Sequence, residues 1–282
     1  MKILVTGANG YLGQGIVSIL VDNNIDVVAT DIKTANVDKR AERIDCDLFS
    51  IEDAFGFFGR PDVVLHLAWL DGFIHNAESH IYNLHRHCGF LKNLVEGGSK
   101  QIAIMGSMHE LGFYEGSIDE NTPCNPMNCY GIAKNSLRYY THWLSTVKPF
   151  IYQWLRGYYI VGNSEYGNSL FSKITAAVKA GKTEFPFTMG LNQFDFIDYS
   201  DFCYQVAATI TQDKINGIIN ICSGRPEKLS DRVERFIKEN GYNINLQYGA
   251  FPDRPYDSKA VWGNNQKIAE ILNTSSIEKI MV

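Results

Sequence analysis

Strong net charge, long apolar runs and closely spaced cysteines are all missing from this chain. Its 26 basic and 31 acidic residues leave a net charge of −5, which argues against the basic footprint of a nucleic-acid-binding protein. No uninterrupted apolar stretch is long enough to cross a bilayer, and Met1 leads almost at once into a predicted strand, without room for a secretory leader. We therefore expect a cytoplasmic protein that binds neither nucleic acid nor membrane.

Metal-ligand spacing is missing as well. None of the six cysteines belongs to a C-x-x-C pair, so free thiols are expected. His80, His85, His87 and Cys88 lie in one stretch, but the three histidines include no helical i, i+4 pair and no matching ligand group occurs elsewhere. The sequence therefore predicts a packed or solvated helix face in this stretch and no metal site.

The chain does contain a regular alternation of apolar strands and amphipathic helices, which weakens from about residue 165 onward. It is 45% hydrophobic over 282 residues, enough for a sizeable core. Such alternation is typical of an α/β protein with a doubly wound parallel sheet covered on both faces. We predict strands at residues 2–6, 26–30, 63–68, 101–105 and 150–155, and helices at 51–58, 77–96, 130–146 and 169–180.

The first predicted strand runs into a glycine-rich turn and then into an apolar stretch with helical spacing. Gly7, Gly10 and Gly13 are spaced three residues apart in this turn. In a dinucleotide-binding turn, the first glycine permits the tight turn, the second lets the backbone approach the pyrophosphate, and the third allows close packing of helix on strand. The N–H groups at the start of the helix would bind the phosphates. The alternative is an ordinary strand–turn–helix without a ligand.

Asp31 follows the second predicted strand. A carboxylate roughly 20 residues beyond the glycines suits hydrogen bonds to a ribose 2′-hydroxyl and repels a 2′-phosphate. The sequence therefore favours NAD over NADP, although Lys33 could soften the repulsion and NADP stays possible. The alternative for Asp31 is a turn residue after a strand.

Tyr130 and Lys134 are four residues apart and share one face of a predicted helix. A nearby ammonium favours the ionised form of a phenol, whose pKa is otherwise about 10. We therefore expect Tyr130 to exchange protons near neutral pH as a general acid or base, with Ser107 donating a hydrogen bond that orients the reacting oxygen. The alternatives are a core aromatic for Tyr130 and a strand-end cap for Ser107.

Taken in order, these motifs resemble those of the extended short-chain dehydrogenase/reductase family, whose members mostly act on nucleotide-linked sugars. The resemblance spans most of the chain. Each motif is weak alone, and the shared order gives the resemblance its strength. Beyond the glycine turn and Asp31, the matching segments are Asp45-Cys46-Asp47-Leu48, His66-Leu67-Ala68, Ser107, Tyr130 with Lys134, Phe194-Asp195-Phe196-Ile197-Asp198 and Asn220-Ile221-Cys222-Ser223-Gly224.

The resemblance implies a Rossmann-type domain at residues 1–164, with returning segments at about 193–224. It also implies a smaller C-terminal lobe, mainly residues 165–282, that holds a nucleotide sugar. Asp47 would contact adenine, Ala68 would line the cofactor site, and Lys134 would hold the nicotinamide ribose. The cofactor-binding residues implied in this way are Gly7, Gly10, Tyr11, Leu12, Gly13, Asp31, Ile32, Asp47, Leu48, Leu67, Ala68, Tyr130 and Lys134.

Three reactions are open within this resemblance. In 4,6-dehydratases the position of Ser107 is followed by an Asp-Glu pair that removes water, whereas this chain has Met108 and His109. Methionine cannot donate a proton, which leaves His109, and less readily Glu110, as the acid or base. Many 4-epimerases of the family carry an asparagine where this chain has Tyr159.

The remaining reaction is reduction of a 4-keto sugar, and the late segments 249–254 and 263–268 look like the ends of nucleotide-sugar ketoreductases. Arg254 matches the arginine that pairs with the substrate diphosphate, since a guanidinium grips phosphate bidentately; the alternative is a solvated loop arginine. We therefore expect reduction of a nucleotide-diphospho-4-keto-6-deoxyhexose by NAD(P)H, in deoxysugar biosynthesis. The implied substrate contacts are Ser107, His109, Tyr130 and Arg254.

Two alternatives to this reductase stay open, together with one prediction about partners. A nucleotide-sugar 4-epimerase with bound NAD would use the same catalytic trio, and a non-catalytic dinucleotide sensor would use the same fold. By the resemblance we also expect a homodimer built on residues 79–96 and 130–146, where Tyr139, Tyr140 and Trp143 would serve the interface or the monomer core.

Overall fold

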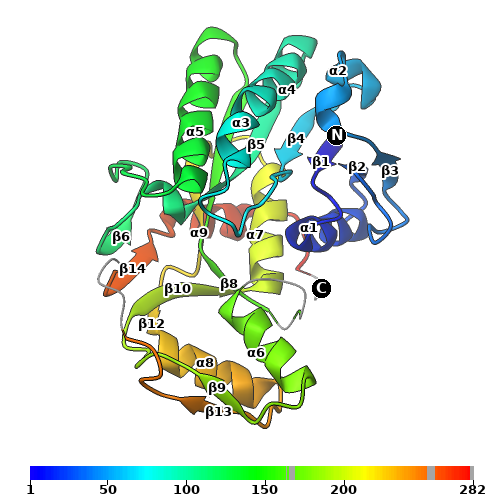
Figure 1. Ribbon diagram of the computed structural model, residues 1–282. Coiled ribbons are helices and arrows are strands. Elements are labelled where there is room, and N and C mark those ends of the chain that lie inside the picture. The colour runs from blue at the N-terminus through cyan, green and yellow to red at the C-terminus, as the bar shows by residue number, and fades with distance from the viewer. Residues whose placement is uncertain (163, 165–168, 253–257, 280–282) are drawn as a thin grey trace.

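The computed structural model describes residues 1–162, 164, 169–252 and 258–279. A parallel sheet of seven strands forms the centre of the larger lobe within these residues (Figure 1). Its parallel pairing throughout confirms the predicted doubly wound α/β fold. Across the sheet the strands are β11 (Gly217–Ile221), β7 (Ile151–Gly157), β5 (Gln101–Ser107), β4 (Val63–His66), β1 (Lys2–Thr6), β2 (Asp26–Asp31) and β3 (Glu42–Asp45).

Helices cover both faces of this sheet because successive side chains of a strand point to opposite sides. Ile3 and Val5 pack with helices on one face, and Leu4 packs on the other. The helices of the first face are α1 (Tyr11–Asp22), α7 (Tyr199–Ile210) and α9 (Gln266–Thr274). Those of the second face are α2 (Ala54–Phe57), α3 (Ser79–Tyr82), α4 (Leu84–Gly97) and α5 (Cys129–Val147).

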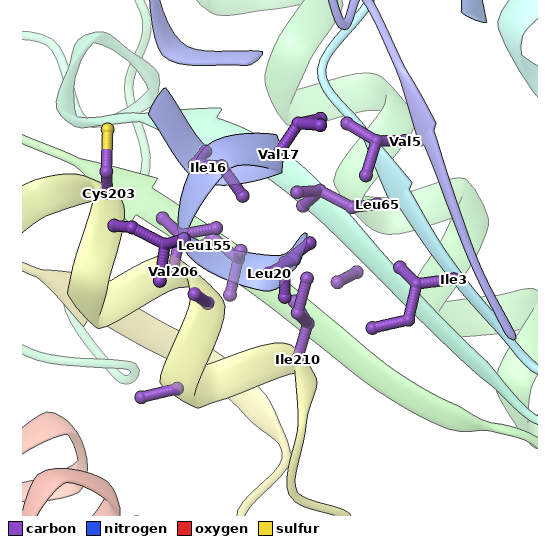
Figure 2. Close-up of a cluster of buried hydrophobic side chains, with 14 of the residues drawn as sticks. Ile3, Val5, Ile16, Val17, Leu20, Leu65, Leu155, Cys203, Val206 and Ile210 are labelled. Atoms are coloured by element: carbon purple, nitrogen blue, oxygen red, sulfur yellow. The ribbon is translucent and has the colours of Figure 1, made fainter. Parts of the chain in front are cut away.

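The core of the first face joins segments that are far apart in the sequence. Figure 2 shows Ile16, Val17 and Leu20 of α1 against Val206 and Ile210 of α7. All five side chains are completely buried. The apolar stretch after the glycine turn is therefore the inner face of a helix, as its spacing predicted.

The smaller lobe lies below the carboxyl side of the large sheet (Figure 1). Phe171, Phe196 and Phe236 centre its apolar cluster. Its second sheet has β12 (Pro226–Lys228), β10 (Gln193–Asp198), β14 (Ala260–Gly263) and β6 (Gly116–Ile118), with β8 (Tyr159–Val161) also paired to β10. Outside this sheet lie the pair β13 (Asn245–Gln247) and β9 (Glu184–Pro186) and the helices α6 (Leu170–Lys179) and α8 (Leu229–Glu239).

Two predicted helices differ from the observed ones. The predicted helix 77–96 is divided into α3 and α4 at Asn83, where the N–H of Arg86 bonds the carbonyl three residues earlier. The predicted helix 51–58 is only the short α2, capped by the Asp53 carboxylate. The predicted division at residue 164 stays a prediction, although β11 is seen to join β7 in the large sheet.

Candidate active site

The glycine turn connects β1 to α1 at the carboxyl edge of the large sheet. Gly7 has a φ of +68°, and a Cβ at this position would lie 2.7 Å from the backbone nitrogen of Ala68. A Cβ on Gly13 would lie 2.4 Å from the Gly7 carbonyl, so α1 packs directly on the turn. A Cβ on Gly10 would meet only the Gly7 carbonyl, at 3.2 Å. The turn is thus packed at its two ends and open in its middle.

The first turn of α1 presents backbone donors beside this opening. Gly10 is the N-cap, no side chain caps the helix, and the first turn contains no acidic residue. Because the first N–H groups of a helix have no partner within it and carry the positive end of the dipole, they form an anion-binding site.

Asp31 lies beside the glycine turn and is held there by backbone groups. Its Oδ2 accepts a hydrogen bond from the N–H of Asn9 at 3.0 Å, and its Oδ1 accepts one from the N–H of Ile32 at 2.8 Å. Each carboxylate oxygen keeps a second lone pair. The carboxylate therefore has a fixed position and can accept a further donor such as a ribose hydroxyl.

The other implied cofactor residues follow the ends of neighbouring strands. Asp47, after β3, caps the short helix η1 (Leu48–Ser50) and lies 3.6 Å from Arg86. Leu67 and Ala68 follow β4, and the Ala68 N–H donates to Thr6 Oγ1 at 3.3 Å. Tyr11 and Leu12 begin α1, and the Tyr11 ring stacks on Tyr199 with centroids 4.3 Å apart. In open α/β sheets this carboxyl edge is where ligands bind.

Ser107, Tyr130 and Lys134 come together one strand farther along this edge. Ser107 ends β5, and Tyr130 lies in the first turn of α5, whose start is fixed by the Asn128 side chain accepting from the Gly131 N–H at 2.8 Å. The Ser107 side chain lies near Tyr130 and acts to lower the pKa of the phenol. Its Oγ also accepts from the His109 N–H at 3.2 Å. Ser107 therefore caps the short helix Met108–Glu110 and also lies next to the Tyr130 phenol.

Lys134 is fully buried beneath Tyr130. Its Nζ donates to the Met105 carbonyl at 2.8 Å and lies 3.8 Å from the centroid of the Trp69 ring. The distance from Nζ to the Tyr130 ring centroid is 5.8 Å. Burial lowers the pKa of Lys134 to about 7, against the opposing effect of the Glu110 charge.

The expectation that Lys134 lowers the pKa of Tyr130 toward neutral pH is wrong for the protein without a bound ligand. Burial raises the pKa of Tyr130 to about 12, and the neighbouring Ser107 side chain offsets this only in part. The ammonium has little effect because it points toward Met105 and Trp69. At neutral pH Tyr130 is therefore a protonated phenol, which suits a proton donor.

His109 and Glu110 take different places, although they are adjacent in the sequence. The His109 ring lies beside His75 and Tyr130, at 4.4 and 6.1 Å between centroids, and burial lowers its pKa to about 4. Glu110 is completely buried, accepts from the Ser107 N–H at 2.6 Å and lies 3.7 Å from Arg156 Nε. Glu110 therefore fixes the backbone of Ser107, while His109 borders the phenol.

Sequence reasoning missed three residues around Tyr130: Trp69, His75 and His80. The His75 ring stacks on the phenol at 5.5 Å and 15°, and the His75 carbonyl accepts from the Tyr130 N–H at 2.8 Å. His80 and Trp69 meet the phenol edge-on, at 5.3 and 6.2 Å. Two signals were available: Trp69 directly follows the His66-Leu67-Ala68 motif, and His80 lies seven residues before His87, on the same side of the predicted helix 77–96.

The sequence of this chain matches a known family and several known proteins. The NAD dependent epimerase/dehydratase family matches residues 3–222. The chain is also 40% identical over 269 residues to dTDP-6-deoxy-L-talose 4-dehydrogenase (NAD(+)) of Aggregatibacter actinomycetemcomitans, which covers 93% of this chain and 99% of that protein. The chain belongs to the NAD dependent epimerase/dehydratase family. The predicted family and the prediction of an NAD-dependent enzyme are thus confirmed.

Two solved structures of epimerases share the fold of this family member. UDP-N-acetylglucosamine 4-epimerase from Methanobrevibacter ruminantium, in complex with UDP-N-acetylmuramic acid, has a TM-score of 0.83 and 21% identity, covering 99% of this chain and 94% of its own. UDP-glucose 4-epimerase of Thermus thermophilus, in complex with NAD, has a TM-score of 0.79 and 19% identity, covering 99% and 95%. At these identities the likeness shows the fold alone.

The residues of this epimerase/dehydratase family member fit a nicotinamide dinucleotide. The open middle of the glycine turn, the uncapped start of α1 and the anchored Asp31 carboxylate lie side by side, so donors for a diphosphate adjoin an acceptor for a ribose. In the described part of the chain, no group of three or more His, Cys, Asp or Glu side chains is placed to hold a metal ion. No helix there has the length and apolar character of a membrane span. Arg254 lies outside the described residues.

Proposed function

We propose that this chain is an NAD-dependent 4-dehydrogenase of a nucleotide-diphospho-6-deoxyhexose, which reduces the 4-keto sugar in the biosynthetic direction. The similarity to a 4-dehydrogenase over almost the full length of both chains supports this reaction. The observation that carries the proposal is the half-buried, protonated phenol of Tyr130 next to Ser107, at the same sheet edge as the glycine turn. Glu110 does not supply the second proton donor of a dehydratase, because its carboxylate is turned into the protein and accepts from the Ser107 N–H.

In this proposal Tyr130 gives its proton to the sugar oxygen at C4 during reduction and recovers it during oxidation. A bound nicotinamide supplies the hydride donor or acceptor for that carbon. Ser107 holds the same oxygen through its hydroxyl, and Lys134 binds the nicotinamide ribose. Positioned proton transfer of this kind contributes roughly 10²–10⁴-fold to the rate.

We further propose that His109 contacts the sugar and that Arg254 pairs with the diphosphate. His109 borders Tyr130 and is neutral at physiological pH because burial lowers its pKa to about 4. A neutral imidazole offers one donor and one acceptor, which suits a sugar hydroxyl. The role of Arg254 rests on its match to the family's arginine.

A panel of nucleotide-linked 4-keto-6-deoxyhexoses, each with NADH or NADPH, tests the proposal. We expect one of them to consume NADH in a one-to-one ratio with substrate, read as loss of absorbance of the reduced nicotinamide. NADPH should react at least about tenfold more slowly, since the Asp31 carboxylate repels a 2′-phosphate. Interconversion of two sugars with only catalytic NAD would show a 4-epimerase instead and would contradict the proposal.

We propose a cytoplasmic homodimer, paired through the outer face of α5. Ile132, Tyr139, Trp143 and Val147 are between 43% and 59% exposed, and their spacing places them on one side of the helix. Replacing Trp143 with Glu should convert the dimer into a monomer in size-exclusion chromatography with light scattering. The same change at the exposed Phe57 of α2 should leave the dimer intact. A monomeric parent protein would contradict the pairing.

A further inference from the structure

Lys134 carries a buried charge without a carboxylate to balance it at close range. Its Nζ has one hydrogen-bond acceptor, the Met105 carbonyl, and one further close contact, the face of Trp69. Among the described residues, the carboxylate of Glu110 pairs with Arg156 and Arg138 and not with Lys134. A buried ammonium with so few partners is costly to keep charged.

The Trp69 face supplies the missing stabilisation. A cation within about 6 Å of an indole centroid is attracted by the ring, and the attraction grows when the cation is desolvated. Lys134 Nζ lies 3.8 Å from this centroid. His87 also stacks on the indole, at 4.5 Å and 13°. Burial lowers the pKa of His87 to about 2, so His87 is neutral and Lys134 is the cation that the indole meets.

The orientation of the indole is itself fixed by His80. Trp69 Nε1 donates to His80 Nδ1 at 3.0 Å, and His80 Nε2 lies 3.0 Å from the Ile74 carbonyl. An indole N–H is only a donor and a carbonyl is only an acceptor. Both contacts are satisfied by one neutral form of His80, with its proton on Nε2. Trp69 therefore cannot turn its face away from Lys134 without losing this bond.

We propose that Trp69 is a positioning residue for Lys134: its indole face holds the ammonium and favours its charged form, and His80 locks the indole in place. The contact between Trp69 and Lys134 does not depend on the proposed function. The importance of Lys134 for turnover rests on that proposed function. Glu110, in the turn after β5, favours the ammonium form of Lys134. The other titratable groups that interact with Lys134 are His66 from β4 and His87 from α4, whose pKa values the ammonium lowers.

The test measures the charge of Lys134 directly and its effect on turnover separately. Protein labelled with [ε-¹³C]lysine is titrated by NMR, with the Lys134 signal assigned through its loss in Lys134→Met. The variants are Trp69→Leu and Trp69→Met, which remove the aromatic face, and Trp69→Phe, which keeps one but loses the bond to His80. The pH profile of kcat/KM is recorded for each variant. Trp69→Leu and Trp69→Met both lack the aromatic ring, so the test still stands if one of them does not fold.

In Trp69→Leu and Trp69→Met we expect the pKa of Lys134 to be lower by roughly half a unit to one and a half units. In Trp69→Phe we expect less than half of this decrease. The alkaline limb of the pH profile should move to lower pH by the same shift, because Lys134 then loses its charge earlier. An unchanged pKa of Lys134 in both Trp69→Leu and Trp69→Met overturns the proposal. A shifted titration with an unmoved pH profile supports the Trp69 contact and refutes the catalytic role proposed for Lys134.

Discussion

The dinucleotide end and the reactive end of the same sheet edge are built by different means. At the dinucleotide end, Gly7, Gly10, Gly13 and Asp31 lie close together in the sequence and act through backbone shape and one carboxylate. At the reactive end, Tyr130 and Lys134 are surrounded by aromatic and histidine side chains from the segment between β4 and α3, from α3 and from the turn after β5. The first end is a local motif, whereas the second exists only after folding.

This difference has an electrostatic consequence. At the dinucleotide end the charged group is the half-buried Asp31 carboxylate, which backbone N–H groups hold in place. At the reactive end burial decides the charge state: it raises the pKa of Tyr130 to about 12 and lowers that of Lys134 to about 7. Substitutions at the two ends should therefore impair different properties of the protein: turnover at the reactive end, and stability or cofactor binding at the dinucleotide end.

Replacing Tyr130 with Phe should have the largest effect. We expect a loss of roughly 10²–10⁴-fold in kcat, because the proton donor is removed. Binding of NADH, followed by its fluorescence, should change by less than about twofold, since the ring and its contacts with His75 and His80 are retained. Tyr204→Phe makes the same change on α7 and should be neutral. Turnover at the parent rate in Tyr130→Phe would show that another group supplies the proton.

The glycine turn offers a matched pair of substitutions at the other end. Gly13→Ala should destabilise the protein by about 1–3 kcal/mol, because its Cβ would lie 2.4 Å from the Gly7 carbonyl and 2.6 Å from Ala8 Cα. Gly10→Ala should keep most of the stability and weaken cofactor binding, because its Cβ points into the open middle of the turn. Thermal unfolding and NADH titration separate the two effects. Equal stabilities of the two variants would contradict the packing described.

A smaller effect is expected in the pH dependence of stability, and it belongs to the reactive end. His66 and His87 are hydrogen-bonded to each other at 2.9 Å, and burial lowers their pKa values to about 3 and about 2. The unfolded chain, with histidine pKa values near 6.5, binds more protons below that pH. The contribution of this pair is therefore complete above about pH 6.5 and is lost as the pH falls toward 3.

Each of these histidines should reduce the free energy of unfolding by about 1 kcal/mol between pH 6 and pH 5. His87→Phe, which keeps an aromatic ring against Trp69, should remove its share of this loss. Urea unfolding at the two pH values measures the difference. The same loss in His87→Phe as in the parent protein would mean that His87 is not the buried neutral group described.

The sequence predicted what depends on local pattern. The glycine turn, Asp31 and the positions of Ser107, Tyr130 and Lys134 follow from spacing, and the large parallel sheet follows from the alternation of strands and helices. The pKa of Tyr130 was predicted in the wrong direction, because i, i+4 spacing gives the proximity of two residues but not their burial or the direction of the Lys134 ammonium. Trp69 and His75 were missed because their segment, between β4 and α3, meets α5 only in the folded chain.

Transfer of deuterium from [4,4-²H₂]NADH, which carries deuterium on both faces of the nicotinamide C4, tests the central claim most directly. With a nucleotide-linked 4-keto-6-deoxyhexose as substrate, we predict one deuterium at C4 of the product for each NADH consumed, and formation of this product roughly 10²–10⁴-fold more slowly by Tyr130→Phe. Product without deuterium at C4, or deuterated product formed equally well by Tyr130→Phe, would contradict the account.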